Sequence, residues 1–350
     1  MLDTPRNDAP VTEEMIEQRL KTGLRNQWWA ICPSHFVKEK PVSLFRLGYR
    51  MVLWRKYDGT VAALEDFCPH RGAPLSRGIS IDDRIACGYH GVQVDDKGVA
   101  VSVPGSPGCK LEGMRCVRTF PIIEKFGVIF AYVSDDATPN PEPEPFVAPE
   151  QLSSPEYSHF LNYAEWAGDY RFVIDNVMDP MHGTFLHKQS HSMNFGDTTA
   201  KFVITDTDNG FIFEKDGQRG VNFDFSEWGE TGIHWLRLEI PYPKSGGPGG
   251  NFHIVGMYTP INDKMAAIFH WRCRKVDGWQ RDAWRFLYKN RLEARHHHVL
   301  EQDRVMIEDF HTDPRGREIL YQHDIGLVRL RRRLASLARE QLEAEAQAGA

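Results

Sequence analysis

The chain has 350 residues, of which 41% are hydrophobic and 26% charged, so it is long enough to bury the cores of two domains. Its formal net charge of −6 disfavours a nucleic-acid-binding protein, which would need a basic surface. No apolar run reaches the roughly 18 residues of a membrane helix, and the acidic, polar N-terminus does not resemble a signal peptide. We therefore expect a cytoplasmic protein with no membrane or nucleic-acid partner.

The pattern of apolar residues predicts a small β domain behind a short helical segment. Within the N-terminal segment 1–27, residues 11–25 carry apolar side chains at helical spacing, and we expect this helical segment to pack on the second domain. Residues 28–137 consist of short β-rich runs separated by turns, which predicts an all-β domain. Five prolines between 138 and 150 predict a stiff linker.

The second domain is expected over residues 151–350. A helical pattern over 164–187 precedes six strand-like runs, and helical patterns return over 280–310 and 314–348. A sheet followed by helices predicts an α+β domain in which the helices cover one face of an antiparallel sheet.

Two mixed cysteine–histidine pairs form the first candidate site. One residue separates Cys68 from His70, two residues separate Cys87 from His90, and sixteen residues lie between the pairs. Two thiolates and two imidazoles can hold a zinc ion, or a [2Fe–2S] cluster in which two histidines replace two cysteines on one iron. Zinc fingers usually group their cysteines apart from their histidines, so the mixed pairs favour the cluster, with a zinc ribbon as the alternative.

Two glycines and a third loop suit the same cluster. Gly72 and Gly91 follow the pairs and allow the tight turns that cluster-binding loops need. The segment 102–105 (Ser-Val-Pro-Gly) is expected to form a third loop that covers the site.

His182 and His187 form the second candidate site. Residues five apart on a regular helix point about 140° away from each other. Both histidines can therefore bind one metal only if the helix ends or bends between them, and Gly183–Thr184 soften that segment. Two histidines and one carboxylate are the ligands of non-haem Fe(II) sites, which keep positions open for oxygen and substrate.

Both motifs resemble those of the Rieske non-haem iron aromatic-ring oxygenases, and the resemblance runs from Trp28 to about Leu330. The segments that carry it are CPHRGAPLSRG, CGYHG and DNVMDPMHGTFLH, in the order found in the family. The resemblance implies a [2Fe–2S] cluster on the first site and a mononuclear Fe(II) on the second. It also implies an all-β Rieske domain followed by a catalytic domain of the helix-grip (START-like) fold.

The third iron ligand has to come from later in the chain. The segment 300–309 (LEQDRVMIED) resembles the acidic motif of the family, in which Asp303 is the expected ligand. Glu301, Glu308 and Asp309 compete with it, and an exposed acidic helix face is the alternative explanation for the whole segment. The run 296–298 (three histidines) is not expected to bind the metal, because consecutive helical residues diverge by about 100°.

Asp179 and Asn176 are expected to assist the iron site as catalytic residues. In the family, the position of Asp179 links the two redox centres by hydrogen bonds to a histidine of each. The local alternative is a helix N-cap, because Pro180 follows Asp179 and proline favours the first helical position. Asn176 belongs to the same resembling segment.

The strands between the two iron ligand segments are rich in aromatic residues, most of which a sheet packed on helices would bury in its core. A minority are expected to line an apolar cavity over the iron, which favours a planar aromatic substrate. The residues are Phe202, Phe211, Phe213, Phe223, Phe225, Trp228, Trp235, Phe252, Tyr258, Phe269 and Trp271.

The resemblance implies the oxygenase (α) subunit of a multicomponent enzyme, in the phthalate dioxygenase and vanillate O-demethylase-like branch. The chain has no nucleotide-binding fingerprint, so a separate NADH-dependent reductase, with or without a ferredoxin, would supply electrons. O2 and a small aromatic substrate would react by mono-oxygenation or O-demethylation, with cis-dihydroxylation as the alternative. The family also implies a homotrimer. A Rieske electron carrier, or an iron–sulfur sensor without turnover, is a more distant alternative.

Overall fold

The structure is a computed structural model that describes residues 10–136, 142–189, 197–218, 225–230, 235–242, 250–310 and 314–348. Inter-residue contacts divide the chain into two units. Unit 1 comprises Met1–Pro145, Thr259–Asn262 and Ala335–Ala350, and unit 2 comprises Phe146–Tyr258 and Asp263–Leu334. The chain first passes between the units inside the predicted proline-rich linker, of which residues 137–141 lie outside the described ranges.

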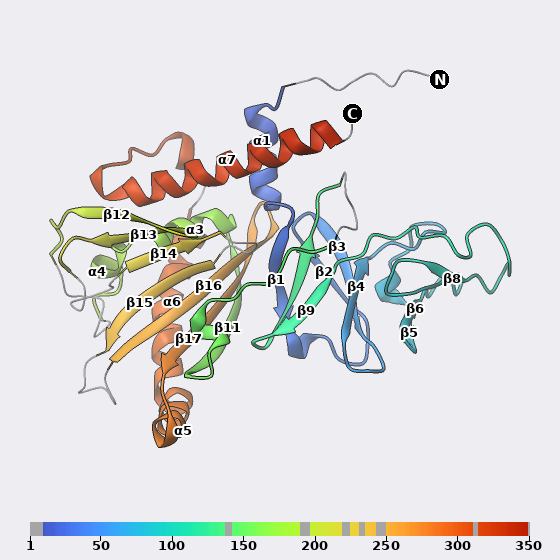
Figure 1. The fold of residues 1–350 in the computed structure, drawn as a ribbon, viewed down its shortest axis with the longest axis horizontal. Helices are drawn as coiled ribbons and strands as arrows, with labels where there is room; N and C mark the ends of the chain where they lie inside the picture. The colour runs from blue at the N-terminus through green and yellow to red at the C-terminus, as the bar shows by residue number, and fades with distance from the viewer. Residues whose placement is uncertain are drawn as a thin grey trace. The chain divides into compact units, whose positions relative to one another are not determined.

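Unit 1 contains three small antiparallel sheets in its described part, with strand orders β1-β10-β9, β2-β3-β4 and β5-β6-β7-β8 (Figure 1). Strands β1 and β10 are buried along their whole length, so their sequences show no polar–apolar alternation. The bounds are α1 Glu13–Thr22, β1 Gln27–Pro33, η1 Ser34–Phe36, β2 Val42–Arg46, β3 Tyr49–Arg55, β4 Val61–Glu65, η2 Leu75–Arg77, β5 Ile79–Ile81, β6 Arg84–Ala86, β7 Gln93–Val94, β8 Ala100–Ser102, β9 Ile122–Lys125 and β10 Val128–Val133.

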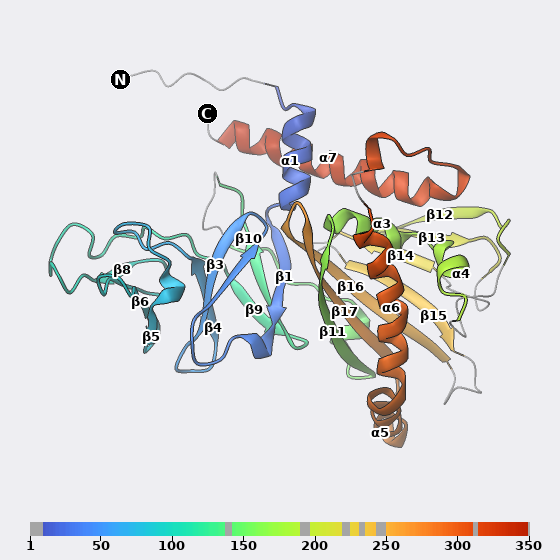
Figure 2. The same ribbon diagram turned by 180° about the vertical axis from the view of Figure 1, so that it is seen from behind.

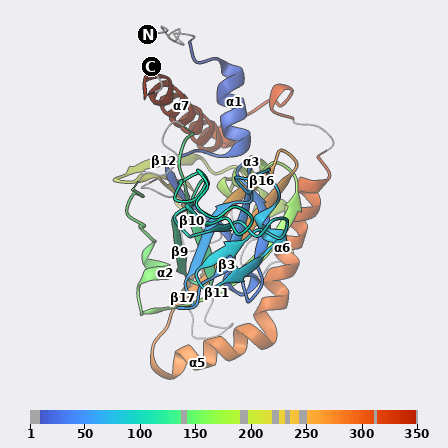
Figure 3. The ribbon, with the colours of Figure 1, turned by 90° about the vertical axis from the view of Figure 1, so that its right-hand side faces the viewer.

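Helix α1 begins where the sequence predicts. The hydroxyl of Thr12 accepts a hydrogen bond from the Met15 amide at 3.3 Å, which caps the helix. On its side, Arg19 forms an ion pair with Glu345 of α7 (Ile325–Ala348) at 2.7 Å, and α7 runs across α1 there (Figure 3). This contact explains why the end of α7 is grouped with unit 1, although the sequence placed it in the second domain.

Unit 2 is built on one antiparallel sheet with the strand order β11-β17-β16-β15-β14-β13-β12. Helices α3 and α6 pack on one face of this sheet (Figure 2). The bounds are α2 Glu150–Ser153, β11 Tyr157–Ala167, α3 Tyr170–Met178, α4 His182–Leu186, β12 Phe202–Thr207, β13 Gly210–Lys215, β14 Phe225–Gly229, β15 Trp235–Tyr242, β16 Gly250–Asn262, β17 Met265–Lys275, α5 Gly278–Leu287, the π-helix η4 Tyr288–Leu292, α6 Glu293–Glu308, η5 Pro314–Gly316 and η6 Gln322–Asp324. The three small β-sheets of unit 1, followed by a sheet covered by helices in unit 2, confirm the predicted α+β architecture with an N-terminal β domain.

The predicted helix over 164–187 is wrong in its first part. Residues up to Ala167 belong to β11, an edge strand that pairs with β17, and the helix begins only at Tyr170. The carboxylate of Asp169 accepts a hydrogen bond from the Arg171 amide at 2.9 Å and so caps this helix. The edge position leaves β11 only partly buried, so its sequence carries a weak strand pattern.

The later helices also differ in detail from the predictions. The helical run over 280–310 is interrupted by the π-helical turn η4, and the run predicted from 314 becomes a continuous helix only at Ile325. Of the predicted core aromatics, Phe223 lies outside the described residues. Among the helices that the structure describes, none is long and apolar enough to cross a membrane.

Candidate functional site

The two cysteine–histidine loops of unit 1 share one backbone pattern. The Cys68 amide donates to the Ala73 carbonyl at 2.8 Å, and the Gly72 amide donates back to the Cys68 carbonyl at 2.8 Å. Cys87 and Gly91 make the same two bonds in the second loop, at 2.8 and 2.9 Å. Gly72 and Gly91 have φ of 73° and 74°, in the left-handed region that favours glycine, as the sequence predicts.

The side chains of the two loops divide between the interior and the surface. Cys68 and Cys87 are 2% and 3% exposed and belong to one hydrophobic cluster. His70 and His90 are exposed, with ring centroids 4.7 Å apart. Two neighbouring thiols inside and two neighbouring imidazoles outside fit the donor set of a Rieske cluster, whose irons differ in their ligands.

Burial affects the Cys68 thiol, and the third predicted loop borders the second cysteine–histidine loop. Desolvation raises the pKa of the Cys68 thiol to about 11, so the thiol holds its proton at neutral pH, and a bound metal ion would displace that proton. Pro104, in the segment predicted as a covering loop, has a ring carbon 3.4 Å from the point that a Cβ on Gly91 would occupy. The third loop therefore contacts the second cysteine–histidine loop.

In unit 2, the helix that carries His182 ends before His187. Helix α4 ends at Leu186, and His187 follows with φ −98° and ψ 38°, outside the helical region. The end of the helix brings the two imidazole rings together, with their centroids 5.1 Å apart. This is one of the two ways in which the sequence allowed both rings to reach one metal ion.

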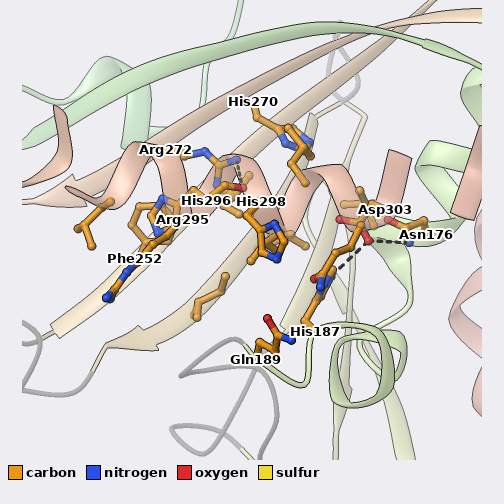
Figure 4. A pocket seen from close by; sticks show the side chains of 18 of the residues that line it. Asn176, His187, Gln189, Phe252, His270, Arg272, Arg295, His296, His298 and Asp303 are labelled. Carbon is orange, nitrogen blue, oxygen red and sulfur yellow. Dashed lines mark hydrogen bonds and ion pairs between the residues drawn. The ribbon is translucent and has the colours of Figure 1, made fainter. Parts of the chain in front are cut away.

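Asp303 of α6 joins the two histidines, and Figure 4 shows it beside His187. Its Oδ1 lies 3.5 Å from Nε2 of His182 and 3.2 Å from Nε2 of His187, and the three ligand atoms lie within 4.8 Å of one another. Atoms that bind one ion at about 2.1 Å and at right angles lie about 3 Å apart. We call these three residues the metal triad, since their donor atoms fit a single metal ion.

The competing acids of the same segment have other partners. Glu301 and Glu308 both form ion pairs with Arg304 on the surface of α6. Asp309 is the C-terminal cap residue of the helix. Asp303 differs from them because it is 8% exposed and faces the histidines.

In His182 and His187, the Nδ1 atom of the ring makes a hydrogen bond, which leaves the Nε2 atom available to bind a metal ion. His187 Nδ1 lies 2.9 Å from Oε1 of Gln302, and His182 Nδ1 lies 2.5 Å from the carbonyl oxygen of Asp179. Each acceptor fixes the proton on Nδ1. Burial disfavours the protonated form of His187, but its bonds to Asp303 and Gln302 outweigh this and raise its pKa. Gln302 was not predicted from the sequence, although it directly precedes Asp303.

Asp179 and Asn176 both contact the metal triad or its backbone. The Asp179 carboxylate accepts hydrogen bonds from the amides of Met181 and His182, at 2.7 and 3.1 Å. It therefore caps the turn before α4, whereas Pro180 lies outside the helix and is not its first residue. Asn176 Nδ2 lies 3.3 Å from Oδ1 of Asp303, to which it donates a hydrogen bond.

Lys215 supports the same helix and was not predicted from the sequence. It lies at the end of β13, is 1% exposed, and its Nζ donates to Oγ1 of Thr184 at 3.2 Å. Burial lowers the pKa of Lys215, whereas Asp179 and Asp197 act in the opposite direction. The apolar stem of Lys215 occupies a core position of the strand. The pattern of apolar residues in the sequence does not reveal this, because lysine is a polar residue that such a pattern places on the surface.

A cavity of about 570 Å³ adjoins the metal triad (Figure 4). Of the aromatic residues predicted as possible lining, Phe252 alone is found in its wall among the described residues, and most of the others are buried in the core. Most of the wall surface is apolar, as expected, but the wall also includes two of the three consecutive histidines that were not expected to bind metal. Its polar residues beyond the metal triad include Gln189, His270, Arg272, Arg295, His296, His298 and Gln302.

Two family models match consecutive parts of the chain. Residues 27–121 match the Rieske [2Fe-2S] domain, and residues 166–340 match the vanillate O-demethylase oxygenase C-terminal domain. Together the two matches cover both candidate sites, and the second match alone covers half of the chain.

Curated relatives include oxygenase subunits of demethylases. The chain is 34% identical over 178 residues to a vanillate O-demethylase oxygenase subunit of Pseudomonas sp. (strain HR199 / DSM 7063). This match covers 47% of this chain and 46% of the relative. It is 32% identical over 183 residues to the oxygenase component of dicamba O-demethylase from Stenotrophomonas maltophilia. This second match covers 52% of this chain and 53% of the relative. The matches thus span about half the length of these relatives.

Solved structures show the same fold over most of the chain. Dicamba monooxygenase bound to 3,6-dichlorosalicylic acid matches with a TM-score of 0.67 and 24% identity, over 91% of this chain and 98% of that chain. A carbazole-bound complex of the oxygenase and ferredoxin of carbazole 1,9a-dioxygenase matches with a TM-score of 0.73 and 21% identity, over 95% of each chain. With both family models matched in order, the chain belongs to the Rieske aromatic oxygenase α-subunit family, and its second half is a vanillate O-demethylase oxygenase C-terminal domain.

Proposed function

We propose that the chain is the oxygenase component of a multicomponent Rieske non-haem iron oxygenase. It would use O2 and NADH-derived electrons to oxygenate a small aromatic compound, by mono-oxygenation or O-demethylation. The observation that carries this proposal is the convergence of His182, His187 and Asp303 beside a cavity, in a chain that also presents paired cysteine–histidine loops. The demethylase relatives support the same reaction class.

We assign the metal triad to a mononuclear Fe(II). When bound, such an ion supplies oxygen activation through its open coordination positions. Gln302 and the Asp179 carbonyl hold the two imidazoles with their Nε2 lone pairs toward the ion. Asn176 donates to Oδ1 of Asp303, the same carboxylate oxygen that faces the two histidines, and so helps to fix that oxygen while the cavity admits the substrate.

We assign Cys68, His70, Cys87 and His90 to the [2Fe–2S] cluster, which stores one electron when bound. The buried thiols shield one side of this site from water, and the exposed imidazoles leave the other side accessible. A separate NADH-dependent reductase, with or without a ferredoxin, would dock there. The predicted domain bounds of 28–137 and 151–350, the homotrimer and the cytoplasmic location are part of the same proposal.

The first experiment is EPR of the anaerobically reduced protein, with iron and acid-labile sulfide counted in the same sample. We expect a Rieske signal with about three irons and two sulfides per chain. Two irons that do not rise after addition of ferrous iron would instead indicate an electron carrier. Zinc without an EPR signal would contradict the proposal altogether. O2 uptake with a reductase and a panel of aromatic compounds then separates an oxygenase from a sensor, which would show no substrate-stimulated uptake.

A further inference from the structure

Arg272 is a buried cation in the wall of the cavity beside the metal triad (Figure 4). It lies on β17 and is 4% exposed. Side chains two residues apart on a strand point to the same face, so Arg272 shares its face with His270 and Arg274. Arg274 lies over the ring of Trp284 in α5, which identifies this face as the one covered by the helices.

The guanidinium of Arg272 has no carboxylate hydrogen-bonded to it within the described structure. Its Nη2 lies 3.4 Å from the carbonyl oxygen of His296, and the guanidinium also forms a hydrogen bond with the neutral hydroxyl of Tyr288, whereas its Nε has no hydrogen-bond partner in the described part of the chain. Asp303 and Glu293 act on it through space, but Asp303 faces the two histidines and Glu293 pairs with Lys289. A buried charge without a counter-ion is strongly unfavourable, so the site is built for an anion that enters the cavity.

Two further buried nitrogens in the same cavity wall also have no described partner. They are Nδ1 of His270 and Nδ1 of His296. Burial, with Arg272 adding to it, lowers the pKa of His270 to about 3 and that of His296 well below its ordinary value. Both rings are therefore neutral, and each can offer an N–H group without adding a second charge.

The orientation of His270 is fixed by the strand beside it. Its Nε2 lies 2.7 Å from the hydroxyl of Tyr258, whose pKa burial raises well above its ordinary value. The protonated phenol can donate to Nε2, which places the ring proton on Nδ1. A Cβ at Gly256 would lie 2.3 Å from this hydroxyl, so the arrangement requires glycine there.

We infer that the substrate of this enzyme carries an oxyanion group, a carboxylate or a sulfonate, and that Arg272, assisted by His270 and His296, binds it. The inference rests on the proposed function and adds the substrate class to it. The Nε–Nη2 edge of a guanidinium matches two oxygens of such a group. Leu238, Ile240 and Ile254 supply an apolar wall for the ring that carries the anion. Arg272 is thus a specificity-determining residue, and the metal triad receives another part of the same molecule.

The test uses calorimetric titration of the anaerobic, metal-loaded protein with matched probes. Benzoate is compared with benzamide, and 2-naphthoate with 2-naphthamide, so that only the charge differs within a pair. We expect each acid to bind at least tenfold more tightly than its amide. Arg272→Met should abolish this preference, Arg272→Lys should keep part of it, and Arg291→Met, an exposed arginine outside the cavity wall, should leave it unchanged. Benzenesulfonate distinguishes a carboxylate site from a sulfonate site.

Equal affinity for acid and amide, or no binding of any anion, would overturn the inference. So would an anion preference that survives in an Arg272→Met variant with the melting temperature and cluster EPR of the wild type. If that variant does not fold, the acid–amide pairs on the wild type and on Arg272→Lys decide. Three irons per chain without an anion preference would refute the inference alone, whereas two irons with a clear preference would refute the oxygenase and keep the anion site.

Discussion

The ammonium group of Lys215 lies 3.2 Å from the hydroxyl of Thr184, a residue that lies between the two histidines of the metal triad in the sequence. A five-residue helix has little stability of its own, so the place of α4 depends on side chains that hold it from outside. Asp179 holds its first turn and Lys215 holds its middle. A residue from a neighbouring strand therefore helps to fix the two histidines.

Replacing Lys215 by methionine should weaken iron binding at the metal triad about tenfold, because α4 loses its central anchor. The free energy of unfolding should change by less than about 2 kcal/mol, since removal of a buried charge offsets the lost bond. Competition with an iron chelator measures the affinity. Lys201→Met, at an exposed lysine, is the matched control, and an unchanged affinity in Lys215→Met would refute the anchoring role.

Gln302→Leu should lower the iron affinity of the metal triad by about 10- to 100-fold. The variant removes the acceptor for His187 Nδ1–H, so the ring can turn or place its proton on Nε2. Gln302→Glu keeps an acceptor oxygen at this position and should retain most of the affinity. Equal affinities in the leucine and glutamate variants would mean that Gln302 does not orient His187.

Asp303→Ala should remove about one iron per chain and abolish turnover, while the Rieske EPR signal stays intact. His182→Ala should behave in the same way. Iron counting and EPR on one sample separate the two sites. Glu301→Gln is the control, because Glu301 pairs with Arg304 on the surface. A normal turnover rate in either triad variant would exclude that residue as a ligand.

Asp179→Asn separates the capping role of this residue from its charge. The amide oxygen can still accept a hydrogen bond from the Met181 or His182 amide, so the change in unfolding free energy should stay below about 1 kcal/mol. We expect both metal contents to be retained and single-turnover product formation to fall sharply, because the residue is proposed to couple the two centres. Wild-type product formation in this variant would leave Asp179 with the capping role only.

The stability of the protein should fall as the pH drops from about 6.5 towards 3. Burial, reinforced by Arg272, lowers the pKa of His270 to about 3, whereas its ordinary value is 6.5. Between these values the unfolded chain binds a proton that the folded protein does not, which costs about 1.4 kcal/mol per pH unit. His270→Gln should flatten the slope of unfolding free energy against pH in urea titrations. The exposed His297→Gln should keep the slope, and identical slopes in both variants would contradict the assignment.

The sequence predicts the metal ligands better than it predicts the residues that support them. Cys68, His70 and their counterparts lie close together in the chain, so their spacing alone carries the signal. Asp303 was predicted through a resembling segment, because no local pattern connects it with His182. Lys215 and Arg272 act across strands and helices, and their partners are set by tertiary packing that no local pattern encodes. The edge strand β11 was missed for a related reason, since partial burial weakens its alternation.

The matched bonds of the two cysteine–histidine loops set a limit on how this region can vary. In each loop the cysteine amide bonds to the carbonyl five positions later, so one inserted or deleted residue would break both bonds at once. The tip of the hairpin between β5 and β6, at Asp82 and Asp83, is exposed and belongs to neither loop. Sequences that share this domain should therefore differ in length at the hairpin tip and keep the number of residues in each loop constant.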